Sequence, residues 1–335
     1  EISECLVGSE MCIRDRTYTD NSTEYKDFEA GEHYLQLDRT ERDMLDLVCS
    51  NFDNVIVVYN GANAMELGFI NEYSQIKSAI WCPGTGQSGF EALGEIVAGT
   101  VNPSGKTSDT FVADLTATPT WNNFGYFKYD NMDEYAYTSN NFKTGEEETA
   151  LPSFVNYVDG IYVGYRFYET AAAEGLINYD DTVVYPFGYG LSYTTFTQEM
   201  GAISEDNGTI SFDVTVTNTG DVAGKDVVEV YYNPPYTNGG IEKASANLIQ
   251  FEKTEVLQPG DSQTITVSFD AEDMASYDTY GAGCYVLEAG DYQISINSDS
   301  HNVIDSQTYT VASTVTYDES NPCLLYTSPS PRDTR

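Results

Sequence analysis

Basic residues, histidine and long apolar runs are all scarce in this 335-residue chain. It carries 15 lysines and arginines against 53 aspartates and glutamates, which gives a formal net charge of −38 at pH 7, and it has two histidines. A surface this acidic repels phosphate backbones and anionic lipid, so we expect neither nucleic acid nor a membrane surface as a partner. No uncharged apolar run approaches the ~18 residues of a membrane span. A neutral polar partner such as a carbohydrate is compatible with this charge.

Cysteine is also scarce once the two ends of the chain are set aside. Residues 1–16 and 323–335 resemble translated sequencing-adapter read-through, and neither continues the pattern of its neighbours, so both are predicted artefacts and are excluded from fold reasoning. The cysteines that remain are Cys49, Cys82 and Cys284, whose separation predicts no disulfide framework. Because His33 and His301 are isolated in the sequence, we expect no metal site, and no cofactor is expected either.

The first part of the chain alternates helix and strand patterns. Thr40, with Asp43 three residues later, predicts the N-cap of a helix that ends near Asn51. Val55–Tyr59 is a continuous β-branched run, which is typical of a strand buried on both faces. A short helix, a strand and a longer helix are expected next, at 64–70, 78–82 and 90–98. This alternation predicts an α/β sandwich domain with a parallel or mixed sheet and helices on its faces.

The next stretch has less regular patterning. Residues 121–150 are rich in Asn, Tyr, Asp and Glu and predict a long surface excursion. Residues 160–169, Gly-Ile-Tyr-Val-Gly-Tyr-Arg-Phe-Tyr-Glu, predict an aromatic, strand-like segment. It leads to residues 185–196, where one proline, two glycines and five aromatics in twelve residues predict an ordered, tightly turned connector.

Beyond the connector the hydrophobic period becomes two. Ile210, Phe212, Val214 and Val216 alternate with polar residues and end at an Asn-Thr-Gly turn. Further strands are expected at 226–232, 248–255, 262–269, 284–287 and 291–297. Short strands with regular turns predict an all-β sandwich of immunoglobulin or fibronectin III type.

One motif suggests a different function. Residues 84–89, Gly-Thr-Gly-Gln-Ser-Gly, match the dinucleotide fingerprint G-x-G-x-x-G between a strand and a helix. Its confirming feature is an acidic residue that ends the next strand, but Asp109 follows a turn instead. A Walker A loop is excluded because Phe90-Glu91 stands where Lys-Ser/Thr is required. We therefore expect that this motif is an isolated match and that the chain binds no nucleotide there.

Five ordered motifs favour a family of enzymes instead. They are Ala64-Met-Glu-Leu-Gly-Phe, Ile80-Trp-Cys-Pro-Gly-Thr-Gly-Gln-Ser-Gly89, Val101-Asn-Pro-Ser-Gly-Lys106, Gly160-Ile-Tyr-Val-Gly-Tyr-Arg166 and the connector Tyr185-Pro-Phe-Gly-Tyr-Gly-Leu-Ser-Tyr-Thr-Thr-Phe196. Together they resemble the C-terminal half of glycoside hydrolase family 3, whose members are typically β-glucosidases. The resemblance implies a C-terminal α/β sandwich domain at 17–184, the connector at 185–196, a fibronectin III-like domain at 197–312 and a tail at 313–335.

The resemblance also implies a retaining double displacement with two carboxylates. In the family the nucleophile is an Asp on a (β/α)8 barrel, which nothing in this chain resembles. The acid/base is a Glu in a loop of the α/β sandwich domain, for which Glu24, Glu29 and Glu32 are the carboxylates in the right neighbourhood. We expect the acid/base itself to be lost upstream, where residue 16 meets Thr17. Glu32 is the alternative candidate within this chain, although a glutamate is more commonly a solvated surface charge. We therefore expect a C-terminal fragment that does not hydrolyse glycosides alone.

Three other residues have alternative interpretations. Trp81 could stack on a substrate sugar or could be a partly buried core aromatic. Arg166 could bind sugar hydroxyls, although a structural hydrogen bond to backbone is the expected role. Glu66 is expected to be solvated or to cap a helix. The alternative function for the whole chain is a non-catalytic carbohydrate-binding or cell-surface module.

Overall fold

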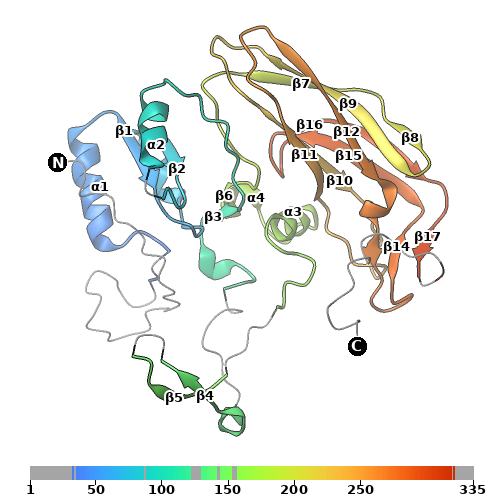
Figure 1. The fold of residues 1–335 in the computed structure, drawn as a ribbon, viewed down its shortest axis with the longest axis horizontal. Helices are drawn as coiled ribbons and strands as arrows, with labels where there is room; N and C mark the ends of the chain where they lie inside the picture. Colours follow the sequence, from blue (N-terminus) through green and yellow to red (C-terminus); the bar gives the residue numbers. More distant parts are fainter. Residues whose placement is uncertain are drawn as a thin grey trace. The chain divides into compact units, whose positions relative to one another are not determined.

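The computed structural model describes residues 32–33, 35–86, 88–121, 130–141, 144–152, 157–318 and 320. Glu24, Glu29 and both adapter-like ends therefore lie outside the described residues. The chain divides into two compact units, residues 1–84 with 112–160 and residues 85–111 with 161–335. The elements are drawn in Figure 1, and each unit is taken separately below.

The first unit is an α/β arrangement with little regular structure after its second strand. It contains α1 (Arg39–Asn51), β1 (Val55–Tyr59), η1 (Gly68–Asn71), β2 (Ile76–Trp81), η2 (Leu115–Ala117), η3 (Met132–Tyr135), β4 (Tyr137–Asn140) and β5 (Glu147–Ala150). The 3-10 turn η1 stands where a helix over 64–70 was expected. The hairpin of β4 and β5 lies within the segment for which no regular structure was expected.

The N-cap of helix α1 lies two residues before the predicted one. Its N-cap is Asp38, whose Oδ1 accepts a hydrogen bond from the backbone N of Glu41 at 2.7 Å. Glu41 Oε2 accepts in turn from the backbone N of Asp38 at 3.1 Å, which completes a capping box. The prediction of Thr40 as N-cap was wrong because Asp38 and Glu41 have the same spacing and form both hydrogen bonds.

Strands β1 and β2 pair in parallel, from Val55 beside Ile76 to Tyr59 beside Trp81. Among the described residues this sheet has two strands. In β1 only Val55 is buried, and Ile56 is 46% exposed. The predicted burial of this strand on both faces is therefore wrong for the described chain, because no further strand of the sheet is there to flank it. Parallel sheets are normally covered on both faces, so this pair presents unusually exposed apolar surface.

The second unit is dominated by a β-sandwich. It contains α2 (Phe90–Val97), α3 (Tyr165–Ala173), α4 (Tyr179–Thr182), β6 (Val183–Tyr185), β7 (Phe196–Met200), β8 (Ser204–Asp206), β9 (Thr209–Asn218), β10 (Val227–Asn233), β11 (Asn247–Lys253), β12 (Ser262–Asp270), η4 (Ala271–Met274), β13 (Ser276–Tyr277), β14 (Tyr285–Leu287), β15 (Gly290–Asn297), β16 (Val303–Val311) and β17 (Val315–Tyr317). The short strand β3 (Phe111–Val112) lies at the sequence boundary of the two units.

Helix α3 replaces the strand expected over 160–169. Gly164, at φ +59°, precedes it in a backbone conformation that favours glycine, and Tyr165 is its first residue. Alanines occupy its last turn, at 171–173, and Gly175, at φ +69°, follows its end. The aromatic run indicated a strand. A helix forms instead because alanine has a strong helix propensity and because glycines stand just before and just after the segment, where a helix begins and ends.

The sandwich consists of two antiparallel sheets that face each other in Figure 1. One has the order β12-β9-β7, with β8 also paired to β9, and the other has the order β11-β10-β15-β16. The alternating residues of β9, Ile210 to Val216, are at most 3% exposed and pack in one core cluster with Val228 and Val230 of β10. The predicted fold class, an α/β domain followed by a fibronectin III-like sandwich, is confirmed.

Candidate functional site

Strand β10 is buried on both faces, which is unusual for an antiparallel sheet with one face on the core. Val228 and Val230 point into the sandwich, so Glu229 and Tyr231 lie on its outer face, where they are 4% and 0% exposed. The Tyr231 ring meets Tyr165 of α3 edge-on, with ring centroids 5.9 Å apart. Tyr165 stacks on Phe187 of the connector at 4.7 Å. Helix α3 and the connector therefore cover this face of the sheet.

Thr107 fixes the middle of the connector. Its hydroxyl donates to the carbonyl of Pro186 at 2.6 Å and accepts from the backbone N of Tyr189 at 3.0 Å. Its own carbonyl accepts from the backbone N of Gly188 at 2.8 Å. These bonds join two segments 79 or more residues apart in sequence, which supports the prediction that residues 185–196 are ordered.

Asn102, from the Asn-Pro-Ser-Gly motif, fixes the end of the connector. Its Oδ1 accepts from the Ser192 hydroxyl at 3.0 Å and from the backbone N of Tyr193 at 2.8 Å. Its Nδ2 donates to the carbonyl of Ala223 in the sandwich at 3.1 Å. One amide side chain thus ties the connector to a turn of the β-sandwich, a role that its interpretation as a simple turn residue missed.

Glu229 is a buried carboxyl behind the connector. Its Oε2 accepts from the Tyr231 hydroxyl at 2.9 Å. Burial raises the pKa of Glu229 from 4.5 to about 7, although the hydrogen bond from Tyr231 and the charge of Lys106 oppose the shift. Gly188 has φ +82° and passes so close that a Cβ there would meet the Glu229 carboxylate. The connector therefore requires glycine at this position for both its backbone angle and its close approach.

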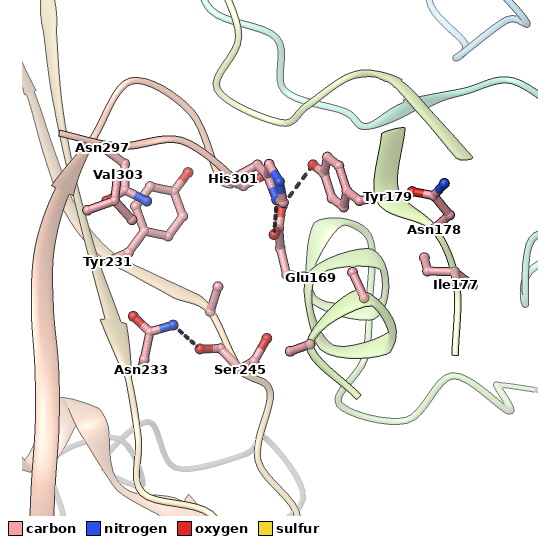
Figure 2. A pocket seen from close by; sticks show the side chains of 14 residues that line it. Glu169, Ile177, Asn178, Tyr179, Tyr231, Asn233, Ser245, Asn297, His301 and Val303 are labelled. Atoms are coloured by element: carbon pink, nitrogen blue, oxygen red, sulfur yellow. Dashed lines mark hydrogen bonds and ion pairs between the residues drawn. The ribbon is translucent and has the colours of Figure 1, made fainter. Parts of the chain in front are cut away.

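A second buried carboxyl, Glu169, lies on α3. Its Oε1 accepts from the Tyr179 hydroxyl at 2.8 Å and from the Ser300 hydroxyl at 2.9 Å, and its Oε2 lies 2.8 Å from His301 Nδ1 (Figure 2). Tyr179 and His301 stack with centroids 3.6 Å apart and planes 8° from parallel. Burial raises the pKa of Glu169, and the hydrogen bonds from His301, Tyr179 and Ser300 oppose that rise.

A pocket of about 500 Å³ opens beside this carboxyl. Polar side chains from α3, α4 and the sandwich contribute to it together with small and aliphatic side chains: Glu169, Ala172, Ala173, Ile177, Asn178, Tyr179, Tyr231, Asn233, Ser245, Ala246, Asn297, Ser300, His301 and Val303. No group of three or more His, Cys, Asp or Glu side chains suited to a metal occurs in the described part of the chain. The same residues contain no helix long and apolar enough to cross a membrane. The arrangement is suited to hydrogen bonding with a small molecule.

Comparisons with known proteins give the chain its family. The model of the "Glycosyl hydrolase family 3 C-terminal domain" matches residues 11–193, which is more than half of the chain, and the model of the "Fibronectin type III-like domain" matches residues 226–300. The chain belongs to glycosyl hydrolase family 3. The match begins at residue 11, inside the first of the two segments that resemble adapter sequence.

Several relatives of this chain are named beta-glucosidases. Beta-glucosidase A of Butyrivibrio fibrisolvens is 33% identical over 90% of this chain and 35% of that protein, and the beta-glucosidase of Ruminococcus albus is 32% identical over 97% of this chain and 30% of that protein. The structure of beta-glucosidase 3B from Thermotoga neapolitana in complex with glucose has a TM-score of 0.69 at 29% identity, covering 85% of this chain and 35% of that one. The chain spans about a third of the length of these relatives.

The family 3 resemblance pointed to Glu32 and Trp81 as site candidates. Glu32 is half-buried and belongs to the first unit, as does Trp81 at the end of β2. The Trp81 indole N–H donates to the carbonyl of Gly61 at 2.8 Å, and the side chain is half-buried. Neither residue belongs to the pocket beside Glu169. Their catalytic and substrate-binding roles stay predictions.

Glu66 has one of its two expected roles, whereas the hydrogen bond expected for Arg166 is not made by its Nε. Glu66 Oε1 accepts from the backbone N of Leu115, at the start of η2, at 2.8 Å and lies 3.1 Å from His33 Nε2. Its side chain is 17% exposed, so the capping role fits and the solvated one does not. The guanidinium of Arg166 lies 5.8 Å from the centroid of the Tyr165 ring, and its buried Nε has no hydrogen-bond partner. The expected backbone hydrogen bond is therefore not made by this nitrogen.

The glycine motif at 84–89 joins β2 to α2, as the sequence predicted. Gly84 and Gly86 have φ of +39° and +62°, which accounts for glycine at both positions. Asp109, the acidic residue near the expected distance, precedes the short strand β3 instead of ending a strand. The confirming feature of a dinucleotide site is therefore missing here. The pocket residues Glu169 and His301 were not recognised in the sequence because 132 positions separate them.

Proposed function

We propose that this chain is part of a retaining, exo-acting β-glycosidase, and that the complete enzyme hydrolyses terminal non-reducing β-D-glucosyl residues. The observation that carries the proposal is the identity of 33% to Beta-glucosidase A of Butyrivibrio fibrisolvens over 90% of the chain, through both domains. The alternative of a non-catalytic carbohydrate-binding or cell-surface module is not favoured, since the relatives matched over both domains are named as enzymes.

Residues outside this chain would supply the nucleophile. The family places that Asp on a (β/α)8 barrel, and the chain spans about a third of its relatives. The exposed β1–β2 pair also supports a larger protein, because a parallel sheet is stable when helices or further strands cover it. Without the nucleophile no glycosyl-enzyme intermediate forms, so the chain alone is expected to be inactive.

The experiment compares the chain alone with the longer protein encoded by the complete gene. Both are assayed on aryl β-D-glucoside, β-D-galactoside, β-D-xyloside and α-L-arabinopyranoside, the last because one relative is an exo-α-(1→6)-L-arabinopyranosidase of Bifidobacterium breve. We expect the complete protein to have its largest kcat/KM on the glucoside and the chain alone to match the buffer blank. A larger kcat/KM on another glycoside would contradict the glucosidase proposal. Turnover by the chain alone that is lost on mutation of Glu24, Glu29 or Glu32 would place a catalytic carboxylate within it.

We further propose that Trp81 contacts the substrate in the complete enzyme. Its N–H donates to the carbonyl of Gly61, which holds the half-buried ring in place at the end of β2. Trp81→Phe keeps an aromatic face and loses the N–H, whereas Trp81→Ala loses both. We expect Trp81→Ala to raise KM and Trp81→Phe to leave it nearly unchanged. Equal KM values in all three proteins, with lower melting temperatures in both variants, would assign Trp81 to the core.

A further inference from the structure

One lining residue of the pocket beside Glu169 has a buried side-chain oxygen without a hydrogen-bond partner. Asn297, near the end of β15, is 3% exposed, and its Oδ1 is buried without a hydrogen bond. A buried polar atom without a hydrogen bond has lost its contact with water and gained nothing in return, which is unfavourable. A hydroxyl group that entered the pocket and reached Asn297 would remove that cost.

His301, which also lines the pocket, is held in a fixed orientation. Because a carboxylate only accepts hydrogen bonds, the contact between His301 Nδ1 and Glu169 places the ring proton on Nδ1. The stacked Tyr179 ring fixes the plane of the imidazole. In the neutral ring Nε2 is then an acceptor, and the side chain is 38% exposed. His301 is therefore ready to accept a hydrogen bond from a ligand.

Small side chains leave room between these polar groups. Ala172 and Ala173 of α3 line the pocket where longer side chains would fill it. Ile177 and Val303, labelled in Figure 2, add apolar surface. The volume of about 500 Å³ lies within the range of small-molecule sites. A ligand of one or two sugar rings fits this range.

The charges and side chains around the pocket argue against an anion or a metal ion as its ligand. Glu169 and the net charge of −38 disfavour an anion, and the described residues hold no cluster of three metal-ligating side chains for a cation. Amide, imidazole and hydroxyl groups both donate and accept, which matches the hydroxyls of a polyol. We propose that this pocket binds a neutral, polyhydroxylated ligand the size of a mono- or disaccharide, with His301 and Asn297 as hydrogen-bonding groups.

The test measures binding of D-glucose and cellobiose to the 335-residue chain by titration calorimetry and saturation-transfer difference NMR. Ala173→Trp should fill the pocket and abolish binding without removing a hydrogen bond. Leu176→Trp is the control, because Leu176 is 77% exposed and lies outside the pocket. His301→Phe keeps the stacking on Tyr179 and loses the acceptor, so it should weaken binding about tenfold or more.

D-Glucuronate tests the charge argument, because it has the same ring with a carboxylate added. We expect it to bind more weakly than glucose. The proposal is overturned if neither glucose nor cellobiose binds, if Ala173→Trp binds as well as the parent chain, or if glucuronate binds as tightly as glucose. Since the chain alone is expected to be inactive, these outcomes are independent of the assay of the complete enzyme.

Discussion

Replacement of Glu229 by glutamine should change how the stability of the chain depends on pH. Glu229 is 4% exposed, and burial raises its pKa from 4.5 to about 7. Below about pH 4.5 the carboxyl is neutral in the folded and unfolded states, and burying it carries no charge penalty. Between about pH 4.5 and about pH 7 the unfolded chain loses this proton while the folded chain keeps it. The free energy of unfolding therefore falls as the pH rises. Since one pKa unit is worth about 1.4 kcal/mol, the full loss is about 3 kcal/mol above pH 7.

The Glu229→Gln substitution keeps the size of the side chain and an oxygen that accepts from the Tyr231 hydroxyl. The free energy of unfolding of this variant minus that of the parent chain should therefore rise by about 3 kcal/mol from about pH 4 to about pH 8. Urea denaturation followed by far-UV circular dichroism measures both proteins at each pH. The control is Glu252→Gln, which makes the same charge change at an exposed position of β11. A difference that stays constant across this pH range would refute the buried, protonated state of Glu229.

Two further substitutions test the connector, each with a matched control in the second unit. Gly188→Ala should destabilise the chain by about 1–3 kcal/mol more than Gly239→Ala, because both have φ +82° but only Gly188 lies against another group. If both substitutions lowered the free energy of unfolding equally, the close approach of Gly188 to Glu229 would not contribute to stability. Phe187→Ala should cost about 2 kcal/mol and speed proteolysis within 185–196, because the ring stacks on Tyr165, whereas Leu191→Ala, at a side chain 72% exposed, should change neither. Unchanged cleavage in Phe187→Ala would show that the connector is held by its backbone bonds alone.

The sandwich could be predicted because its strands carry the period-two pattern directly. Ile210 to Val216 alternate with polar residues and form the core of β9 as expected. Strand β16 (Val303–Val311) was not predicted, since most of its side chains are exposed and it offers little apolar alternation. Helix α3 was predicted as a strand because its first residues are aromatic, while the signals for a helix were Gly164 and the alanines that follow.

The polar sites depend on contacts between residues that lie far apart in the sequence. Asn102 and Tyr193 are 91 positions apart, and Glu169 and His301 are 132 positions apart. Neither pair could therefore be recognised from local spacing in the sequence. Glu229 offered one signal, a charged residue within the apolar run Val227–Tyr232. Its burial still depends on the connector, which packs on the outer face of β10 and could not be placed from the strand pattern alone.

Covalent trapping of the enzyme intermediate tests the central claim most directly. A 2-deoxy-2-fluoro-β-D-glucoside with a good leaving group labels the nucleophile of a retaining β-glucosidase, and peptide mass spectrometry locates the label. We expect the complete protein to be labelled on an aspartate outside these 335 residues and the chain alone to remain unlabelled. A glycosyl label on any residue of this chain would contradict it.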